Sequence, residues 1–185
     1  KYMNHKFSIV SYADNELTEK IRTLQKEIFN LSGARKAMDE WGPHLTLGSG
    51  PIVEDEDIEE FKKSLEEIIS DEKPFGVELK NFSSYRYTKY KGGVIFIKVI
   101  LNEKLISLVE KIENLTNKYE KWYQLSLPYD PHITLAFRDL TDEGLEKCEE
   151  FFKDKTFLEE VKVDHISIVE KGEDGVGREF ARINF

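Results

Sequence analysis

The sequence predicts a fold of mixed strands and helices, arranged as two similar lobes within one domain. Three observations lead to this prediction. Short apolar segments typical of strands alternate along the chain with apolar stripes at helical spacing. The motif Pro-His-x-Thr-Leu occurs twice, beginning at Pro43 and at Pro131. The elements around the first copy recur around the second at nearly the same offset, as expected for a duplicated unit.

The first half of the chain contains five predicted elements. Gly33 ends the first helix and Pro74 stops the second, while Asp55 and Asp57 suit the positive N-terminal end of that second helix. In order, the elements are a strand over Lys6–Tyr12, a helix with apolar positions from Leu17 to Leu31, a strand over Pro43–Gly48, a helix with apolar positions from Ile58 to Ile69, and a strand over Phe75–Phe82.

The second half repeats this order and adds closing strands. They are a strand over Gly93–Leu101, a helix with apolar positions from Leu105 to Tyr119, a strand with the second motif, a helix with apolar positions from Leu145 to Phe152, and closing strands within Phe157–Glu170 and Arg178–Phe185.

The spacing of the two motifs fixes the relation between the halves. His44 and His132 are 88 positions apart (132 − 44), and the same offset maps Thr46 onto Thr134. We therefore predict a single domain, residues 1–185, with lobe-forming repeats at approximately 6–83 and 93–170 and a closing strand at 178–185. Two repeats are too few for a solenoid, so we expect the lobes to face each other across a pseudo-twofold axis.

Composition narrows the classes of function. The net charge of −9 is unlike that of a protein that grips duplex DNA through many phosphates. The sequence has no apolar run of membrane-spanning length, so we expect no membrane partner. The single cysteine, Cys148, allows no disulfide within the chain, which favours a cytoplasmic location. No pattern indicates an oligomeric interface, so we expect a monomer.

One stretch of the chain is locally basic and aromatic. No acidic residue occurs from Lys80 to Asn102, and lysines alternate there with aromatic residues that include Tyr85 and Tyr87. Cations interleaved with aromatic rings suit a nucleotide or a short single strand. The alternative is a solvated hairpin with tyrosines packed on its flank. Together with Tyr129 and Phe137, which adjoin the second motif, Tyr85 and Tyr87 are candidate substrate contacts.

The two motifs carry the chemistry. Side chains alternate between the two faces of a strand, so buried Leu45 and Ile133 leave His44 with Thr46, and His132 with Thr134, on the opposite faces. An imidazole titrates near neutral pH, so a pair can supply one base and one acid. The two hydroxyls can hydrogen-bond the oxygens of a phosphate. We predict His44 and His132 as catalytic residues in one cleft.

Other interpretations of these residues are weaker. A single His-x-Thr in a strand is usually an ordinary polar pair with no catalytic role. Only its duplication at matched positions favours the catalytic interpretation over this one. Two histidines on separate strands, with no carboxylate at ligand spacing, form a poor metal site. The His-Ile-Ser at His165 lacks both the proline and the leucine, and His5 lies at the start of a strand, so neither is expected to be catalytic.

The pair "HLTL" at His44 and "HITL" at His132 resembles the motifs of the two-histidine (2H) phosphoesterase superfamily, in its branch of 2′-5′ RNA ligases and cyclic phosphodiesterases. The resemblance implies an α+β fold of two pseudo-symmetric lobes, each an antiparallel sheet flanked by two helices, around a central cleft. It implies hydrolysis of 2′,3′-cyclic phosphates of nucleotides or RNA ends, or of related 2′-5′ linkages. It implies His44 and His132 as base and acid, Thr46 and Thr134 as phosphate ligands, and no metal or other cofactor.

The second motif departs from the family pattern at one position. Ligase-type members often carry an arginine directly after His-x-Thr-Leu-Ala, whereas here Phe137 stands there and Arg138 follows. In an extended strand Arg138 would lie roughly 20 Å beyond His132, so we expect it not to reach the phosphate. This favours a small substrate over RNA ligation. Two alternatives stay open: a nucleotide- or RNA-binding module without turnover, and an RNA ligase or RNA-processing enzyme.

Overall fold

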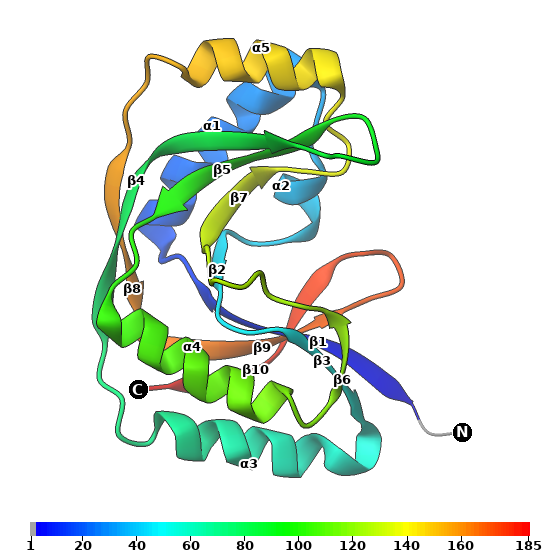
Figure 1. Cartoon of the computed structure of the whole chain (residues 1–185), viewed down its shortest axis with the longest axis vertical. Helices are drawn as coiled ribbons and strands as arrows, with labels where there is room; N and C mark the ends of the chain where they lie inside the picture. Colours follow the sequence, from blue (N-terminus) through cyan, green and yellow to red (C-terminus); the bar gives the residue numbers. More distant parts are fainter. Residues whose placement is uncertain (1–2) are drawn as a thin grey trace.

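The computed structural model describes residues 3–185 and contains two antiparallel sheets, each covered by helices on its outer face (Figure 1). In the first sheet the strand order is β10-β9-β1-β3-β6, and β2 pairs with the second part of β1. Its strands are β1 (Asn4–Tyr12), β2 (His44–Thr46), β3 (Gly50–Glu54), β6 (Glu120–Tyr123), β9 (His165–Lys171) and β10 (Gly177–Asn184).

The second sheet has the strand order β7-β5-β4-β8. Its strands are β4 (Phe75–Arg86), β5 (Gly93–Val99), β7 (His132–Ala136) and β8 (Leu158–Val163). Together the two sheets form the predicted α+β fold of two lobes.

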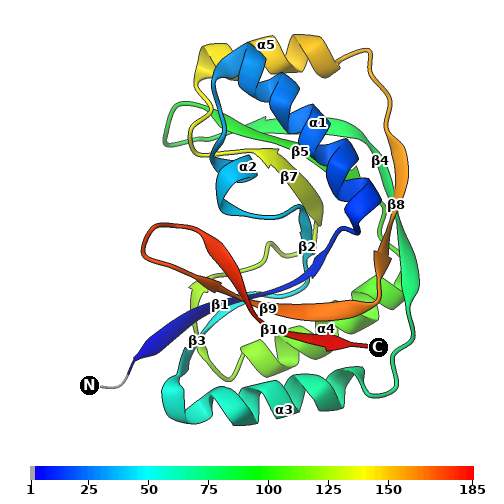
Figure 2. The ribbon, with the colours of Figure 1, turned by 180° about the vertical axis from the view of Figure 1, so that it is seen from behind.

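Two helices flank each sheet. Helices α3 (Ile58–Ile69) and α4 (Glu103–Thr116) pack on each other along the first sheet, with the short 3₁₀ helix η1 (Asp55–Asp57) leading into α3. Helices α1 (Asn15–Ser32) and α5 (Asp142–Phe152) pack on each other along the second sheet, and α2 (Lys36–Glu40) lies beside β7 (Figure 2).

Polar side chains cap the N-termini of α1, α4 and α5, whereas α3 has no side-chain cap. The side chains of Asp14, Asn102 and Thr141 accept hydrogen bonds from the first-turn amides of α1, α4 and α5, which have no partner within their helices. At the other end of α1, Gly33 adopts a φ of 77°, a left-handed conformation that glycine reaches without strain.

The predicted lobe boundaries are wrong, because each sheet draws strands from both halves of the sequence. The first sheet joins β1, β2 and β3 to β6, β9 and β10, and the second joins β4 to β5, β7 and β8. The β4–β5 hairpin spans the junction between 6–83 and 93–170, so the last strand of one repeat pairs with the first strand of the next. Helix α1 also crosses between the repeats: it belongs to the first repeat but packs on α5 and β7 of the second. The predicted closing strand at 178–185 corresponds to β10.

The predicted strand Pro43–Gly48 is also shorter than expected. Strand β2 ends at Thr46, and after a break at residues 47–49 the chain enters β3, which pairs with the first part of β1. The backbone amide of Leu47 donates to the carbonyl of Ile9 within this break. The second motif therefore lies in a longer strand than the first.

Candidate active site

Strands β2 and β7 hold the two motifs and contact each other where the sheets meet. Tyr12 of β1 lies opposite His44, and Lys98 of β5 lies opposite His132. Leu45 and Ile133 are fully buried. Their neighbours in each strand therefore project from the opposite face, as the alternation predicts.

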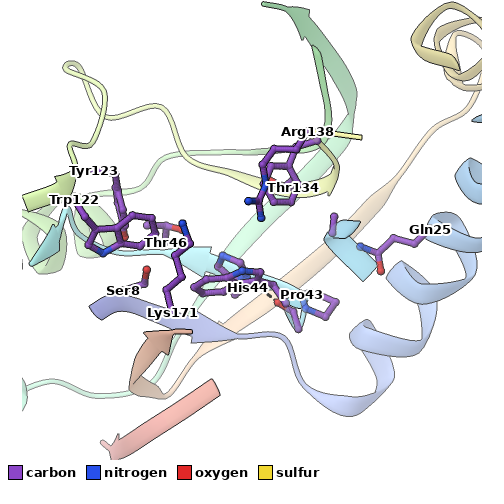
Figure 3. Close-up of a pocket in the computed structure, with 14 residues that line it drawn as sticks. Ser8, Gln25, Pro43, His44, Thr46, Trp122, Tyr123, Thr134, Arg138 and Lys171 are labelled. Atoms are coloured by element: carbon purple, nitrogen blue, oxygen red, sulfur yellow. Dashed lines mark hydrogen bonds between the residues drawn. The ribbon is translucent and has the colours of Figure 1, made fainter. Parts of the chain in front are cut away.

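The four motif side chains line a cleft with two compartments. The aromatic compartment, a cavity of about 340 Å³ (Figure 3), is lined by His44, Thr46 and Thr134 together with Trp41, Trp122, Tyr123, Phe137, Arg138 and Lys171, among others. The polar compartment, of about 230 Å³, is lined by both histidines and both threonines together with Tyr123, Gln124, Ser126, Tyr129 and Asp130, among others. His44, Thr46, Tyr123 and Thr134 line both compartments, so the compartments meet at these residues.

Each catalytic candidate has its ring held by a backbone carbonyl two residues earlier. The Nδ1 atom of His44 lies 2.7 Å from the carbonyl oxygen of Gly42, and that of His132 lies 3.3 Å from the carbonyl oxygen of Asp130. A carbonyl oxygen only accepts hydrogen bonds, so Nδ1 carries the proton in both rings. In the neutral form of each ring, Nε2 is therefore left as the acceptor for a substrate or a water.

Burial lowers the pKa of His44 below its ordinary value. The bond to Gly42 opposes this shift, whereas the positive charge of His132 lowers the pKa further. Aromatic rings surround the imidazole: the Trp41 ring centroid lies 5.3 Å away and that of Tyr12 lies 6.3 Å away. His44 is therefore favoured in its neutral form.

Burial also lowers the pKa of His132, whose ring centroid lies 4.9 Å from that of Phe96. Here the carbonyl and the carboxylate of Asp130 both oppose the shift. A nearby anion favours the imidazolium. His132 has the Asp130 carboxylate for this, whereas no carboxylate raises the pKa of His44. Of the two rings, His132 is the better place for a proton.

A polar network holds the chain segments around the first motif. The carboxylate of Glu113 on α4 accepts hydrogen bonds from the backbone amide and the hydroxyl of Ser49, just beyond β2. The Ser49 hydroxyl in turn accepts from Gln124 and from the amide of Leu125, both in the lining of the polar compartment. The Tyr129 hydroxyl donates to the carbonyl oxygen of Thr46 at 2.7 Å. These bonds connect β2 to the loop that leads into β7.

The four candidate substrate contacts separate into two pairs. Tyr129 lines the polar compartment and Phe137 lines the aromatic compartment. Tyr85 and Tyr87 are not among the residues that line either compartment. Tyr85 packs on Phe96 of β5, with ring centroids 6.0 Å apart, on the sheet face that also carries Thr134. The basic stretch around Tyr85 forms the β4–β5 hairpin.

The chain does not run straight from His132 to Arg138, as the predicted strand assumed. Strand β7 ends at Ala136, and Arg138 has a φ of 56°, so the chain turns instead of continuing straight. The guanidinium lies over the Phe137 ring, 4.5 Å from its centroid, and forms an ion pair with Glu40 on α2. The turn brings Arg138 into the lining of the aromatic compartment beside Thr134 (Figure 3).

Sequence reasoning missed Trp41, Trp122 and Lys171. Trp41 stands three residues before His44, and this proximity was the one local signal available. Its indole N–H donates to the carbonyl of Gly175 in the β9–β10 hairpin at 3.1 Å, while Trp122 comes from β6 and Lys171 from the end of β9. These three residues meet only through the pairing of distant strands.

The remaining histidines lie outside the cleft lining. His165 is buried, accepts the Tyr12 amide on Nε2 at 3.0 Å and donates from Nδ1 to Asp164 at 2.7 Å. The ring of His5 bonds Asp55 and Glu170, each at 2.7 Å. Both rings have structural partners.

Two further findings concern residues 3–185. No three side chains of His, Cys, Asp or Glu gather there in a way that could hold a metal ion. None of the helices in this part of the chain is long and apolar enough to cross a membrane.

Two sheets with helices on their outer faces, which bring two His-x-Thr pairs to one cleft, define the class of 2H phosphoesterases. The chain belongs to the 2′-5′ RNA ligase superfamily, whose family model matches residues 13–175. A comparison with curated proteins gives no match.

Solved structures share this fold. TT0787 of Thermus thermophilus superposes with a TM-score of 0.70 at 17% identity, covering 97% of each chain. E. coli LigT in complex with 3′-AMP gives a TM-score of 0.63 at 16% identity, covering 99% of each chain. E. coli LigT in complex with ATP gives 0.55 at 15% identity, covering 98% of each chain. At these identities the likeness is one of fold.

Proposed function

We propose that this protein is a metal-independent phosphodiesterase that hydrolyses 2′,3′-cyclic phosphates of nucleotides or RNA ends, or related 2′-5′ linkages. One observation carries the proposal. Two imidazoles, each with Nδ1–H bonded to a backbone carbonyl and Nε2 left for a substrate, line one cleft with two threonine hydroxyls. The crystallisation of E. coli LigT with 3′-AMP and with ATP supports a small nucleotide as ligand.

The proposed reaction needs one base and one acid. One neutral imidazole accepts a proton on Nε2 from a water molecule as the water oxygen attacks phosphorus. The other, protonated imidazole gives its Nε2 proton to the 2′ or 3′ oxygen as the bond between that oxygen and phosphorus breaks. The product carries one phosphate monoester and one free hydroxyl, and the pair has exchanged protonation states. Proton exchange with water then restores the starting state.

The surroundings of the two rings support one assignment of roles. The carboxylate of Asp130 favours a proton on His132, while burial and the charge of His132 disfavour one on His44. In the singly protonated pair of the ligand-free protein we therefore assign the proton to His132. His44 then acts as base and His132 as acid.

Thr46 and Thr134 complete the proposed phosphate site. Both line the region where the two compartments meet. Each hydroxyl would donate to one non-bridging oxygen of the phosphate, where negative charge builds up as water attacks. The bond from Tyr129 to the carbonyl of Thr46 supports this role, because it fixes the backbone that carries one of the two hydroxyls.

An RNA ligase is a second candidate that one observation favours. Arg138 lines the aromatic compartment, so the cleft offers a guanidinium despite its shift by one position. A binding module without turnover is the weaker alternative, because binding alone does not require two titratable groups.

A substrate panel tests the proposal. The protein is incubated with the four nucleoside 2′,3′-cyclic phosphates, 2′-5′ dinucleotides and tRNA halves, and the products are identified by mass and phosphorus NMR. Opening of a cyclic phosphate supports the proposal. Joining of tRNA halves without hydrolysis assigns a ligase, and tight binding without any product assigns a binding module.

A further inference from the structure

The aromatic compartment contains a lysine that the proposed reaction does not use. Lys171 is half-buried at the end of β9, and its amino group lies 4.8 Å from the centroid of the Trp122 ring. Within residues 3–185, no carboxylate pairs with it at 4.0 Å or less. A half-buried ammonium beside an aromatic face retains its attraction for an anion.

A second cation faces the same compartment. The guanidinium of Arg138 stacks on Phe137 and pairs with Glu40 through one of its nitrogens. A guanidinium has five N–H donors in a planar fork, so donors remain for a phosphate. Figure 3 shows Lys171 and Arg138 entering the compartment from opposite sides.

The position of the two cations separates them from the reacting phosphate. That phosphate must reach both histidines and both threonines, which requires it to lie where the two compartments meet. Of the two compartments, Lys171 and Arg138 line the aromatic one alone, whereas His132 lines the polar one alone. The two cations therefore face the part of a substrate that extends beyond the reacting group.

We propose that the aromatic compartment binds a nucleoside whose 5′-phosphate is held by Lys171 and Arg138. This inference rests on the proposed function, because it takes the 2′,3′-phosphate of the same nucleoside to lie between the two histidines. The ribose ring carries its 2′ and 3′ oxygens at one end and its 5′ oxygen at the other. A base can stack on the aromatic rings, which contribute about 1–3 kcal/mol per stacked base in other proteins. The cleft thus favours a nucleotide with a 5′-phosphate, as at an RNA end, over a nucleoside cyclic phosphate.

Equilibrium binding tests this without turnover. Titration calorimetry at fixed salt compares 3′-AMP with adenosine 3′,5′-bisphosphate in the wild type, Lys171→Met and Lys162→Met. Methionine keeps most of the apolar stem but donates no hydrogen bond. Lys162 is exposed on β8 in the other sheet and serves as the matched control.

We expect the bisphosphate to bind the wild type and Lys162→Met roughly tenfold or more tightly than 3′-AMP, as one charge-assisted hydrogen bond allows. In Lys171→Met this ratio should fall to about threefold or less. The dinucleotide ApAp extends the comparison. If ApAp also binds more tightly than 3′-AMP, the site accepts a phosphodiester, as within RNA. If only the bisphosphate binds more tightly, the ligand is a free nucleotide.

Two results would overturn the inference. One is a wild type that does not distinguish the two ligands. The other is a Lys171→Met variant that weakens both ligands equally, because Lys171 would then contact the reacting phosphate. A preference for the bisphosphate in a protein that hydrolyses no cyclic phosphate would contradict the proposed function and leave this inference intact. Hydrolysis without that preference would contradict the inference alone.

Discussion

Removal of the Glu113 carboxylate should destabilise the protein more than a single surface contact would explain. Ser49 is fully buried, and both its amide and its hydroxyl donate to this carboxylate. Each buried donor left without an acceptor costs about 1–3 kcal/mol. The Thr116 hydroxyl also donates to this carboxylate, but its loss costs less than that of Ser49, because the same hydroxyl also donates to the backbone carbonyl of Glu113. We therefore expect Glu113→Ala to lower the free energy of unfolding by about 2–4 kcal/mol, after water recovers part of the loss.

Urea unfolding followed by circular dichroism measures this difference. The matched control is Glu110→Ala, an exposed glutamate on the same helix, which should change stability by no more than about 0.5 kcal/mol. Because Ser49 also holds Gln124 and Leu125 in the lining of the polar compartment, Glu113→Ala should lower kcat/KM as well. If Glu113→Ala lost no more stability than Glu110→Ala, the network would not hold β2 in the way described.

Three further predictions concern groups outside the reaction. Activity should survive a strong chelator, because no group of metal-ligating side chains gathers within residues 3–185; loss in EDTA that one divalent ion restores would contradict this. Cys148 is fully buried and burial raises the pKa of its thiol, so thiol reagents should leave native activity intact, and rapid stoichiometric inactivation would oppose this. The hydrogen bond to Asp55 raises the pKa of His5, so its stabilising effect is complete below about pH 6.5 and is lost as pH rises through the raised value. The difference in Tm between wild type and His5→Ala should therefore be larger at pH 6 than at pH 9, with activity near wild type; an equal difference at both pH values would refute this.

The sequence predicted the parts of the site that depend on local periodicity. Leu45 and Ile133 mark the buried face of each strand, so the direction of each histidine and threonine followed from alternation alone. The fold class followed because the duplication retained the order of strands and helices in both halves. Helix ends such as Gly33 followed from local backbone chemistry.

The features that the sequence did not predict depend on long-range pairing. A hairpin between Lys80 and Asn102 was one interpretation of the sequence, but no pattern within 6–83 or 93–170 shows that this hairpin would join β4 to the strands of the second repeat. An apolar strand edge is equally suited to several partners. The aromatic compartment also depends on long-range pairing, since Trp41, Trp122 and Lys171 belong to three separate segments. Arg138 was misplaced because an extended chain was assumed where the backbone adopts a positive φ.

The central claim is tested most directly by the pH dependence of kcat/KM for a nucleoside 2′,3′-cyclic phosphate. This is measured in the wild type, His44→Ala and His132→Ala, after circular dichroism shows that each variant is folded. The wild type should give a bell-shaped profile whose two pKa values belong to the pair, with its maximum below about pH 6.5 because burial lowers the pKa of both rings. Each single variant should lose roughly 10²–10⁴-fold in rate. His44→Ala should lose the acidic limb of the profile and His132→Ala the alkaline limb, and the double variant should lose much less than the product of the two. Near-wild-type turnover in both folded single variants would contradict catalysis by the two histidines.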